Sequence, residues 1–205
     1  MRTHKVQVSI AKRLVVALSL AIFPAVALAG PSQATTLTVL NSVSNSWRAI
    51  ASSADGTKLV AAPFGVDNIY TSSDSGGTWT KQAGSAVKFY TSIASSTNGQ
   101  TLAAVASDGF VYISTDSGVT WVNHNLSASP LFASQLRTVV MSGDGTHLAV
   151  ADVATGSASG GDLYTSTDLG STWIRDHNSS DPSWLGLTMS TDGLTMYAIL
   201  SLIHI

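Results

Sequence analysis

The chain has 205 residues, of which only 11% are charged, and all twelve acidic residues are Asp. Glu, Lys and Arg favour helices, whereas the abundant Thr and Val of this chain suit pleated strands. The composition therefore indicates an all-β fold. Because the sequence contains no Cys, it excludes disulfides and thiolate metal sites.

Residues 1–29 have the features of a secretory signal peptide. Four basic residues precede the apolar run Leu14–Val26, and Ala27-Leu28-Ala29 is a small-x-small cleavage site. The alternative is a membrane anchor, but the uncharged run ends at Ala29 and is shorter than the ~20 residues of a spanning helix, and Pro24 interrupts it. We expect cleavage after Ala29 and a secreted, periplasmic or cell-surface protein.

After this cleavage six basic residues face twelve Asp, which gives a formal charge of −6. No run of basic residues remains, so nucleic acid and insertion into a membrane are not expected. Residues 30–46 form an N-terminal segment before the first repeat.

The motif Ser-x-Asp-x-Gly-x-Thr-Trp occurs three times, with tryptophans 42 and 52 residues apart. Its glycine suits a conformation that a Cβ disfavours, its Ser, Asp and Thr can satisfy the turn backbone, and its Trp can anchor the hairpin. The copies comprise Ser72, Asp74, Gly76, Thr78 and Trp79; Ser114, Asp116, Gly118, Thr120 and Trp121; and Ser166, Asp168, Gly170, Thr172 and Trp173.

A second motif, Asp/Asn-Gly followed by a short apolar run, alternates with the first. Its Asp or Asn residues are Asp55, Asn98, Asp144 and Asp192, which lie 43, 46 and 48 residues apart. Asp-Gly and Asn-Gly favour tight hairpins. Two motifs with a common period of about 45 residues predict four-stranded antiparallel blades that stack on one another.

In the second repeat we predict strands at 90–96, 102–107, 110–114 and 121–125. A large side chain opens each repeat, namely Trp47, Tyr90, Leu136 and Trp184. The predicted blades are 47–89, 90–135 and 136–183, with a truncated one at 184–205, so that about 3.5 blades of an incomplete β-propeller are present.

The first motif resembles the Asp-box, or bacterial neuraminidase (BNR) repeat, of the sialidase-like propeller superfamily. The resemblance covers residues 47–200 and is closest to photosystem II assembly factors and uncharacterised exported bacterial propellers. It implies that the boxes face away from the functional site. It also implies six or more blades, and residues 200–205 resemble a translated sequencing adapter, so we expect the sequence to be an N-terminal fragment.

If the chain were a sialidase, the resemblance would imply a Tyr nucleophile assisted by Glu, together with an arginine triad. This sequence has no Glu. A two-carboxylate glycosidase needs paired Asp residues across a cleft. Catalytic residues therefore stay unassigned. The candidate ligand-binding residues lie on the face opposite the boxes, because loops there carry a propeller's binding chemistry. They are Asp67, Asp152, Asp162, His177, Asp181 and Trp184.

Metals and cofactors are not expected. Calcium needs six to eight oxygens, and each box offers one carboxylate. The five His residues lack zinc-ligand spacing. The sequence thus predicts an exported, non-catalytic scaffold that binds a protein or glycan. The alternative is a glycoside hydrolase, sialidase-like or xyloglucanase-like, with catalytic residues in further blades.

Overall fold

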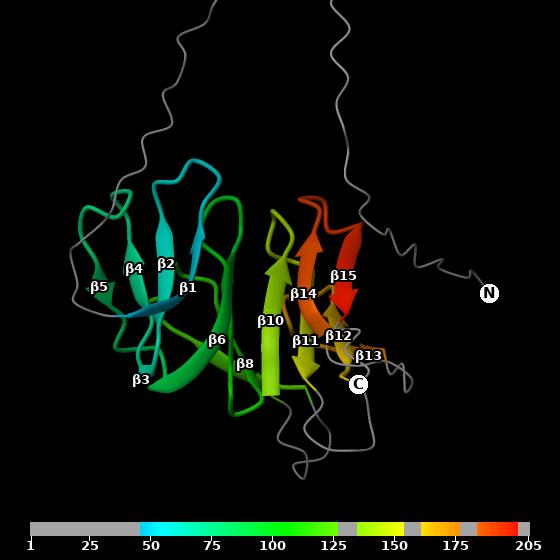
Figure 1. Cartoon of the computed structure of the whole chain (residues 1–205). Helices are drawn as coiled ribbons and strands as arrows, with labels where there is room; N and C mark the ends of the chain where they lie inside the picture. Colours follow the sequence, from blue (N-terminus) through cyan, green and yellow to red (C-terminus); the bar gives the residue numbers. More distant parts are fainter. Residues whose placement is uncertain (1–45, 127–134, 154–160, 177–183, 201–205) are drawn as a thin grey trace, which may run out of the picture. The chain divides into compact units, whose positions relative to one another are not determined.

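The computed structural model describes residues 46–126, 135–153, 161–176 and 184–200, which belong to one compact unit, Val39–Ile205. The regular secondary structure of these residues consists of β-strands alone, which confirms the predicted all-β class (Figure 1). No helix long and apolar enough to cross a membrane occurs among them.

The strands form successive antiparallel sheets that we call blades 1 to 4. Blade 1 has the order β1-β2-β4-β5, blade 2 is β6-β7-β8-β9 with β3 added at its β6 edge, blade 3 is β10-β11-β12-β13, and blade 4 is β14-β15. The bounds are β1 Trp47–Ser52, β2 Leu59–Pro63, β3 Val66–Asp67, β4 Tyr70–Ser72, β5 Thr80–Lys81, β6 Lys88–Ser95, β7 Leu102–Ala106, β8 Phe110–Ser114, β9 Val122–Asn125, β10 Gln135–Met141, β11 Leu148–Val153, β12 Leu163–Ser166, β13 Ile174–Asp176, β14 Trp184–Met189 and β15 Met196–Leu200.

In blades 1 to 3 the second strand is buried along most of its length. All five residues of β7 are buried, so this strand cannot alternate between an apolar and a polar face. Leu102, Ala104 and Ala106 point toward blade 1, whereas Ala103 and Val105 point toward blade 3. Consecutive side chains on a strand project to opposite faces, so a continuous apolar run is expected where both faces are covered.

The hydrophobic core is consequently divided between the blades. One cluster joins Val60, Ala62 and Ile69 of blade 1 to blade 2 residues such as Tyr90 and Ile93. A second cluster joins blade 2 to blade 3 through a corresponding set of residues, Val105, Val111, Ile113, Leu136, Val139, Leu148 and Val150 among them. Apolar burial contributes roughly 25 cal/mol per Å², so each sheet gains its stability from its neighbours.

Antiparallel order places the turns at two ends of every blade. The Asp/Asn-Gly turns and the turns with the Ser-x-Asp-x-Gly-x-Thr-Trp motif, which we call boxes, lie at one end of the blades, called the box end. The connections between second and third strands lie at the other end, called the loop end. At the start of each blade the pairing of the first two strands shifts register across one residue, namely Arg48, Thr91, Arg137 or Leu185. Such bulges redirect a side chain and sit at the loop end here.

The Asp/Asn-Gly turns of neighbouring blades are hydrogen-bonded to one another in a row. The backbone N–H of Ala54 donates to the carbonyl of Thr97 (2.8 Å), that of Thr97 to Gly143 (2.7 Å), and that of Gly143 to Thr191 (2.7 Å). Each donor is the second residue of its turn. This row joins all four blades through their backbones, independently of the apolar clusters.

We predict that Thr97→Pro destabilises the protein by about 1 kcal/mol relative to Thr97→Ala, the net value of one hydrogen bond. Proline suits the second position of the turn that the Gly99 N–H closes on the Ser96 carbonyl (2.9 Å), so the loss falls on the bond between blades 2 and 3. Urea unfolding measures the difference, and equal stabilities of the two variants would contradict the role of the row.

Candidate functional site

The three Asp-box hairpins have the same hydrogen-bond network. In the first, Ser72 Oγ donates to Asp74 Oδ1 (2.7 Å) and accepts from the Gly76 N–H (2.8 Å). The Asp74 carboxylate also accepts from the backbone N–H (2.8 Å) and the hydroxyl (2.7 Å) of Thr78. The second and third boxes repeat these bonds around Asp116 and Asp168. The polar residues of each box thus satisfy the turn itself.

Each box contains two successive residues in the left-handed region. Gly76, Gly118 and Gly170 have positive φ, and so do the preceding Ser75, Ser117 and Leu169, at 56°, 60° and 58°. The sequence analysis anticipated this conformation only for the glycines. In this conformation the backbone N–H of Ser75, Ser117 or Leu169 donates to a carbonyl of the Asp/Asn-Gly turn in the same blade. The acceptors are the carbonyls of Thr57, Gln100 and Thr146.

The box tryptophans are half-buried. Trp121 packs against the cluster between blades 1 and 2, and Trp173 against that between blades 2 and 3. Their Nε1 groups donate to the carbonyls of Gly118 (2.8 Å) and Gly170 (2.9 Å). Trp79 instead packs on Trp47, with ring centroids 5.7 Å apart. The rings of Trp121 and Trp173 therefore close their own hairpins and pack on a cluster between blades, whereas Trp79 packs on the first strand of its blade.

The turn carboxylates have lowered pKa values because they accept several hydrogen bonds. Bonds from Thr78 and Ser72 lower the pKa of Asp74 to about 2. Bonds from the nearby Ser and Thr lower the pKa of Asp55 and Asp144 to about 2 in the same way. Oxygens occupied by these donors are poor metal ligands, and the described residues contain no group of three His, Asp or Glu arranged to hold a metal.

At the loop end, three Asp residues each lie beside a Tyr and a cation. Asp67 pairs with Lys81 (2.6 Å) and Tyr70, Asp108 with Lys88 (2.9 Å) and Tyr112, and Asp162 with Arg175 (2.5 Å) and Tyr164. The ammonium of Lys81 lowers the pKa of Asp67. All three carboxylates are engaged by a cation and a Tyr hydroxyl, so their geometry is that of structural anchors.

The candidate residues of the loop end are only partly brought together. Asp152 and Asp162 are both buried, and the Asp162 N–H donates to the Asp152 carboxylate. Trp184 joins them, because its Nε1 donates to the carbonyl of Gly161 (2.9 Å). Asp67 lies in β3, at the edge of blade 2, apart from this group. His177 and Asp181 lie outside the described residues.

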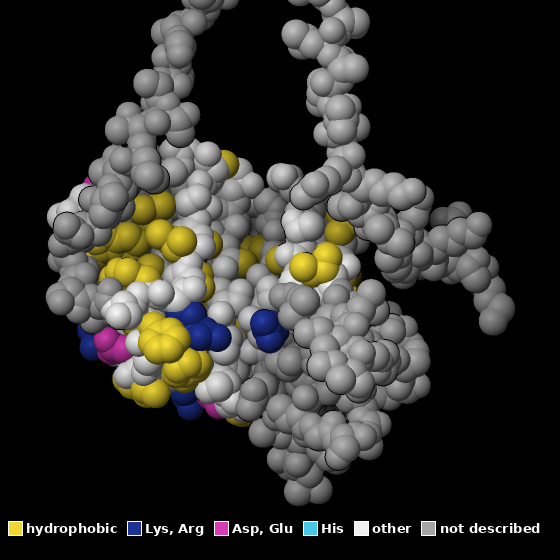
Figure 2. Space-filling view, in the orientation of Figure 1, with side chains coloured by type: hydrophobic (Ala, Val, Ile, Leu, Met, Phe, Trp, Pro, Cys, Tyr) yellow, Lys and Arg dark blue, Asp and Glu magenta, His cyan; other side chains and the backbone are white. Residues whose placement is uncertain are grey.

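A second feature of the loop end is an exposed apolar surface around Arg48, which we call the Arg48 patch: Arg48, Phe64, Val66, Val87 and Phe89. The guanidinium of Arg48 lies over the rings of Phe64 (5.8 Å) and Phe89 (5.1 Å). Phe64, Val66 and Val87 are 60%, 68% and 55% exposed. Figure 2 shows hydrophobic side chains beside Lys and Arg side chains here. Periodicity did not indicate this patch, because its members come from β1, β3, β6 and two connections.

No protein-family model matches the chain, and no curated protein matches its sequence. Among solved structures it is similar to an ancestral GH74 enzyme (15% identity, TM-score 0.59) over 78% of this chain and 22% of the other. It is also similar to YCF48 from Cyanidioschyzon merolae (17%, TM-score 0.54; 77% and 50%) and to the GH74 enzyme of Niastella koreensis (19%, TM-score 0.52; 70% and 23%).

The chain thus spans between about a fifth and a half of the length of these structures. At such low identity the similarity establishes the fold alone. It agrees with the stacked four-stranded sheets described above, and the chain therefore has a β-propeller fold.

We predict that the protein loses stability as the pH falls from 3.8 toward 2. A carboxylate whose pKa is lowered by folding stabilises the folded state above its ordinary pKa of 3.8, and this contribution disappears as the pH falls through the folded value, about 2 for Asp55, Asp74 and Asp144. Thermal unfolding at a series of pH values measures the effect.

Blade 2 supplies the matched variants. Asn98 occupies the position of Asp144 and accepts the same bonds, from the Ser96 hydroxyl (2.9 Å) and the Gln100 N–H (2.9 Å). Asp144→Asn should therefore fold and weaken the pH dependence, whereas Asn98→Asp should strengthen it. Unchanged slopes in both variants would contradict the assignment.

Proposed function

We propose that this chain is an exported, non-catalytic propeller that binds a protein ligand through the Arg48 patch at its loop end. The observation that carries the proposal is the exposure of Phe64, Val66 and Val87 around an arginine. Arginine and aromatic side chains are enriched at the centres of protein interfaces. Contiguous exposed apolar surface on a protein marks an interaction site.

The patch is held in place before any ligand arrives. Arg48 lies over two rings, and Phe64 and Phe89 contact each other with centroids 6.0 Å apart in an edge-to-face geometry. Val66 pairs directly with Phe89 across β3 and β6. A side chain that is already ordered loses little entropy on binding. The guanidinium edge of Arg48 suits a carboxylate of the ligand.

The state of the carboxylates supports a non-catalytic function. A glycosidase requires one protonated and one ionised carboxyl group facing each other across the substrate. Asp67 and Asp162 each form an ion pair with a basic residue, and the box carboxylates are occupied by their own turns. These carboxylates already accept hydrogen bonds from basic side chains or from turn N–H groups.

A glycoside hydrolase is the second candidate, because the similar structures include GH74 enzymes. This chain corresponds to less than a quarter of either enzyme, so a catalytic pair in further blades would complete it. Release of reducing sugar from polysaccharides by the complete reading frame, abolished by Asp or Glu substitutions there, would favour this candidate over the binding function.

The binding function is tested with the protein lacking residues 1–29. Ligands are captured from the exported proteins of the source cells, and the affinity of the captured protein is then measured. Arg48→Glu should weaken binding at least tenfold, about 1.4 kcal/mol. Arg137→Glu is the matched control, because Arg137 is the exposed bulge residue of blade 3. Equal losses in the two variants would show that general charge, and not the Arg48 patch, governs binding.

A further inference from the structure

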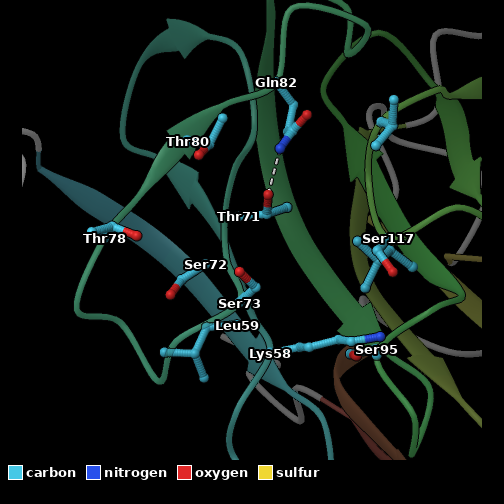
Figure 3. A pocket seen from close by; sticks show the side chains of 13 residues that line it. Lys58, Leu59, Thr71, Ser72, Ser73, Thr78, Thr80, Gln82, Ser95 and Ser117 are labelled. Atoms are coloured by element: carbon cyan, nitrogen blue, oxygen red, sulfur yellow. Dashed lines mark hydrogen bonds between the residues drawn. The ribbon is translucent and has the colours of Figure 1, made fainter.

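A cavity of about 320 Å³ lies between blades 1 and 2, at the box end and away from the Arg48 patch. Its walls include several polar side chains. Blade 1 contributes Lys58, Thr71, Thr80 and Gln82, and blade 2 contributes Ser95 and Ser117. Figure 3 shows these side chains gathered around the cavity, with Lys58 extending toward Ser95. Leu59, Leu102 and Val119 supply its apolar surface.

The repeat structure of the chain shows that this polarity is specific to one interface. Alignment of the boxes and turns places Ile113, Val122, His124, Met141 and Leu169 of blades 2 and 3 at the positions of Thr71, Thr80, Gln82, Ser95 and Ser117. Ile113 is buried in the cluster between blades 2 and 3, and Met141 packs against that cluster. Four of these five positions therefore change from an apolar to a polar residue between one interface and the other.

Two glycines confirm that the compared positions are equivalent in space. A Cβ on Gly118 would lie 2.9 Å from Thr71 Cγ2, and a Cβ on Gly170 would lie 2.3 Å from Ile113 Cδ1. The box glycine of the following blade thus meets the same position of the preceding blade in both interfaces. With Thr71 in place of isoleucine and Ser117 in place of leucine, less apolar side-chain volume is available between blades 1 and 2.

Sheet stacking does not account for this set of residues, because hydroxyl and amide groups between sheets contribute less than the apolar groups they replace. They do, however, suit a small polar ligand. Each hydroxyl both donates and accepts hydrogen bonds, as does the amide of Gln82. The lining includes one cation and no acidic side chain, which disfavours a cationic ligand.

We propose that the cavity between blades 1 and 2 binds a sugar ring. A sugar presents hydroxyls that match the Ser, Thr and Gln groups, and an apolar C–H face that matches Leu59, Leu102 and Val119. The volume lies at the small end of the ~300–1,000 Å³ range of ligand pockets, which fits one ring better than a long oligosaccharide. Lys58 can donate to a ring hydroxyl or pair with the carboxylate of a uronic acid.

Two contacts hold the polar groups in position. The side-chain amide of Gln82 donates to Thr71 Oγ1, which fixes both on one wall. Lys58 passes over Gly99, where a Cβ would lie 2.8 Å from the Lys58 side chain. Because residue 99 is a glycine, the Lys58 side chain has room to extend into the cavity.

The proposal is tested by NMR titration of the protein lacking residues 1–29. The probes are methyl glucoside, methyl galactoside, methyl mannoside, methyl xyloside and N-acetylglucosamine as neutral sugars, and glucuronate as the acidic one. We expect at least one probe to shift the side-chain amide resonances of Gln82 in a saturable manner at millimolar concentration. Tighter binding of glucuronate would assign Lys58 to a carboxylate, and tighter binding of a neutral sugar would assign it to a hydroxyl. No saturable shift with any probe overturns the proposal.

The chain itself supplies a variant that removes the polar wall. Thr71→Ile combined with Ser117→Leu introduces the residues found at the same positions of the next interface, and Leu169 shows that leucine tolerates the left-handed conformation of position 117. We expect sugar affinity to fall at least tenfold without a decrease in Tm. Thr115→Ala, an exposed box residue outside the cavity, is the control and should bind as the wild type does.

Unchanged sugar affinity in the double variant would overturn the location of the site. The Arg48 patch is not altered by these substitutions, and protein binding there is measured separately. The sugar site and the proposed protein-binding function can therefore fail independently of each other.

Discussion

Burial of both faces of the second strand in blades 1 to 3 is the constraint on which the rest of this structure depends. A strand such as β7, with five buried residues in succession, can exist only between two other sheets. The hydrophobic core is therefore distributed among the interfaces between blades. Blade 2, which has a neighbour on each side, contributes to both clusters. The box turns and the loop-end residues lie at the two ends of these stacked blades.

The turns at the box end are ordered by hydrogen bonds of their own polar side chains. Each turn uses a Ser and an Asp or Asn to satisfy its own backbone, and the bonds between Ala54, Thr97, Gly143 and Thr191 connect the turns of successive blades. The Ser of the Asp/Asn-Gly turn recurs in all four blades at Ser53, Ser96, Ser142 and Ser190. Without disulfides, these local networks and the interblade bonds hold the box end together.

Both proposed sites involve positions at which the repeats differ. The bulge carries an arginine in blades 1 and 3, as Arg48 and Arg137, whereas in blade 2 it carries Thr91, whose hydroxyl donates to the carbonyl of Leu136 (2.7 Å) and ties blade 2 to blade 3. The cavity between blades 1 and 2 is lined by Thr71 and Ser117, whereas the equivalent positions between blades 2 and 3 are Ile113 and Leu169. Positions shared by all repeats maintain the stack, and the differences among equivalent positions are free to serve a ligand.

The sequence by itself determined the all-β class, the approximate strands of the second repeat and the residues of the box turns, because these depend on local periodicity and on turn chemistry. It also singled out Asp67, Asp152 and Asp162 at the loop end, but not Asp108. Only the tertiary structure showed that Asp67 and Asp162 are held by cations, that Arg48 lies over the rings of Phe64 and Phe89, and that Thr71 and Ser117 face one cavity. These contacts join residues from different sheets, and the stacking of sheets, which no local pattern encodes, decides which side chains meet.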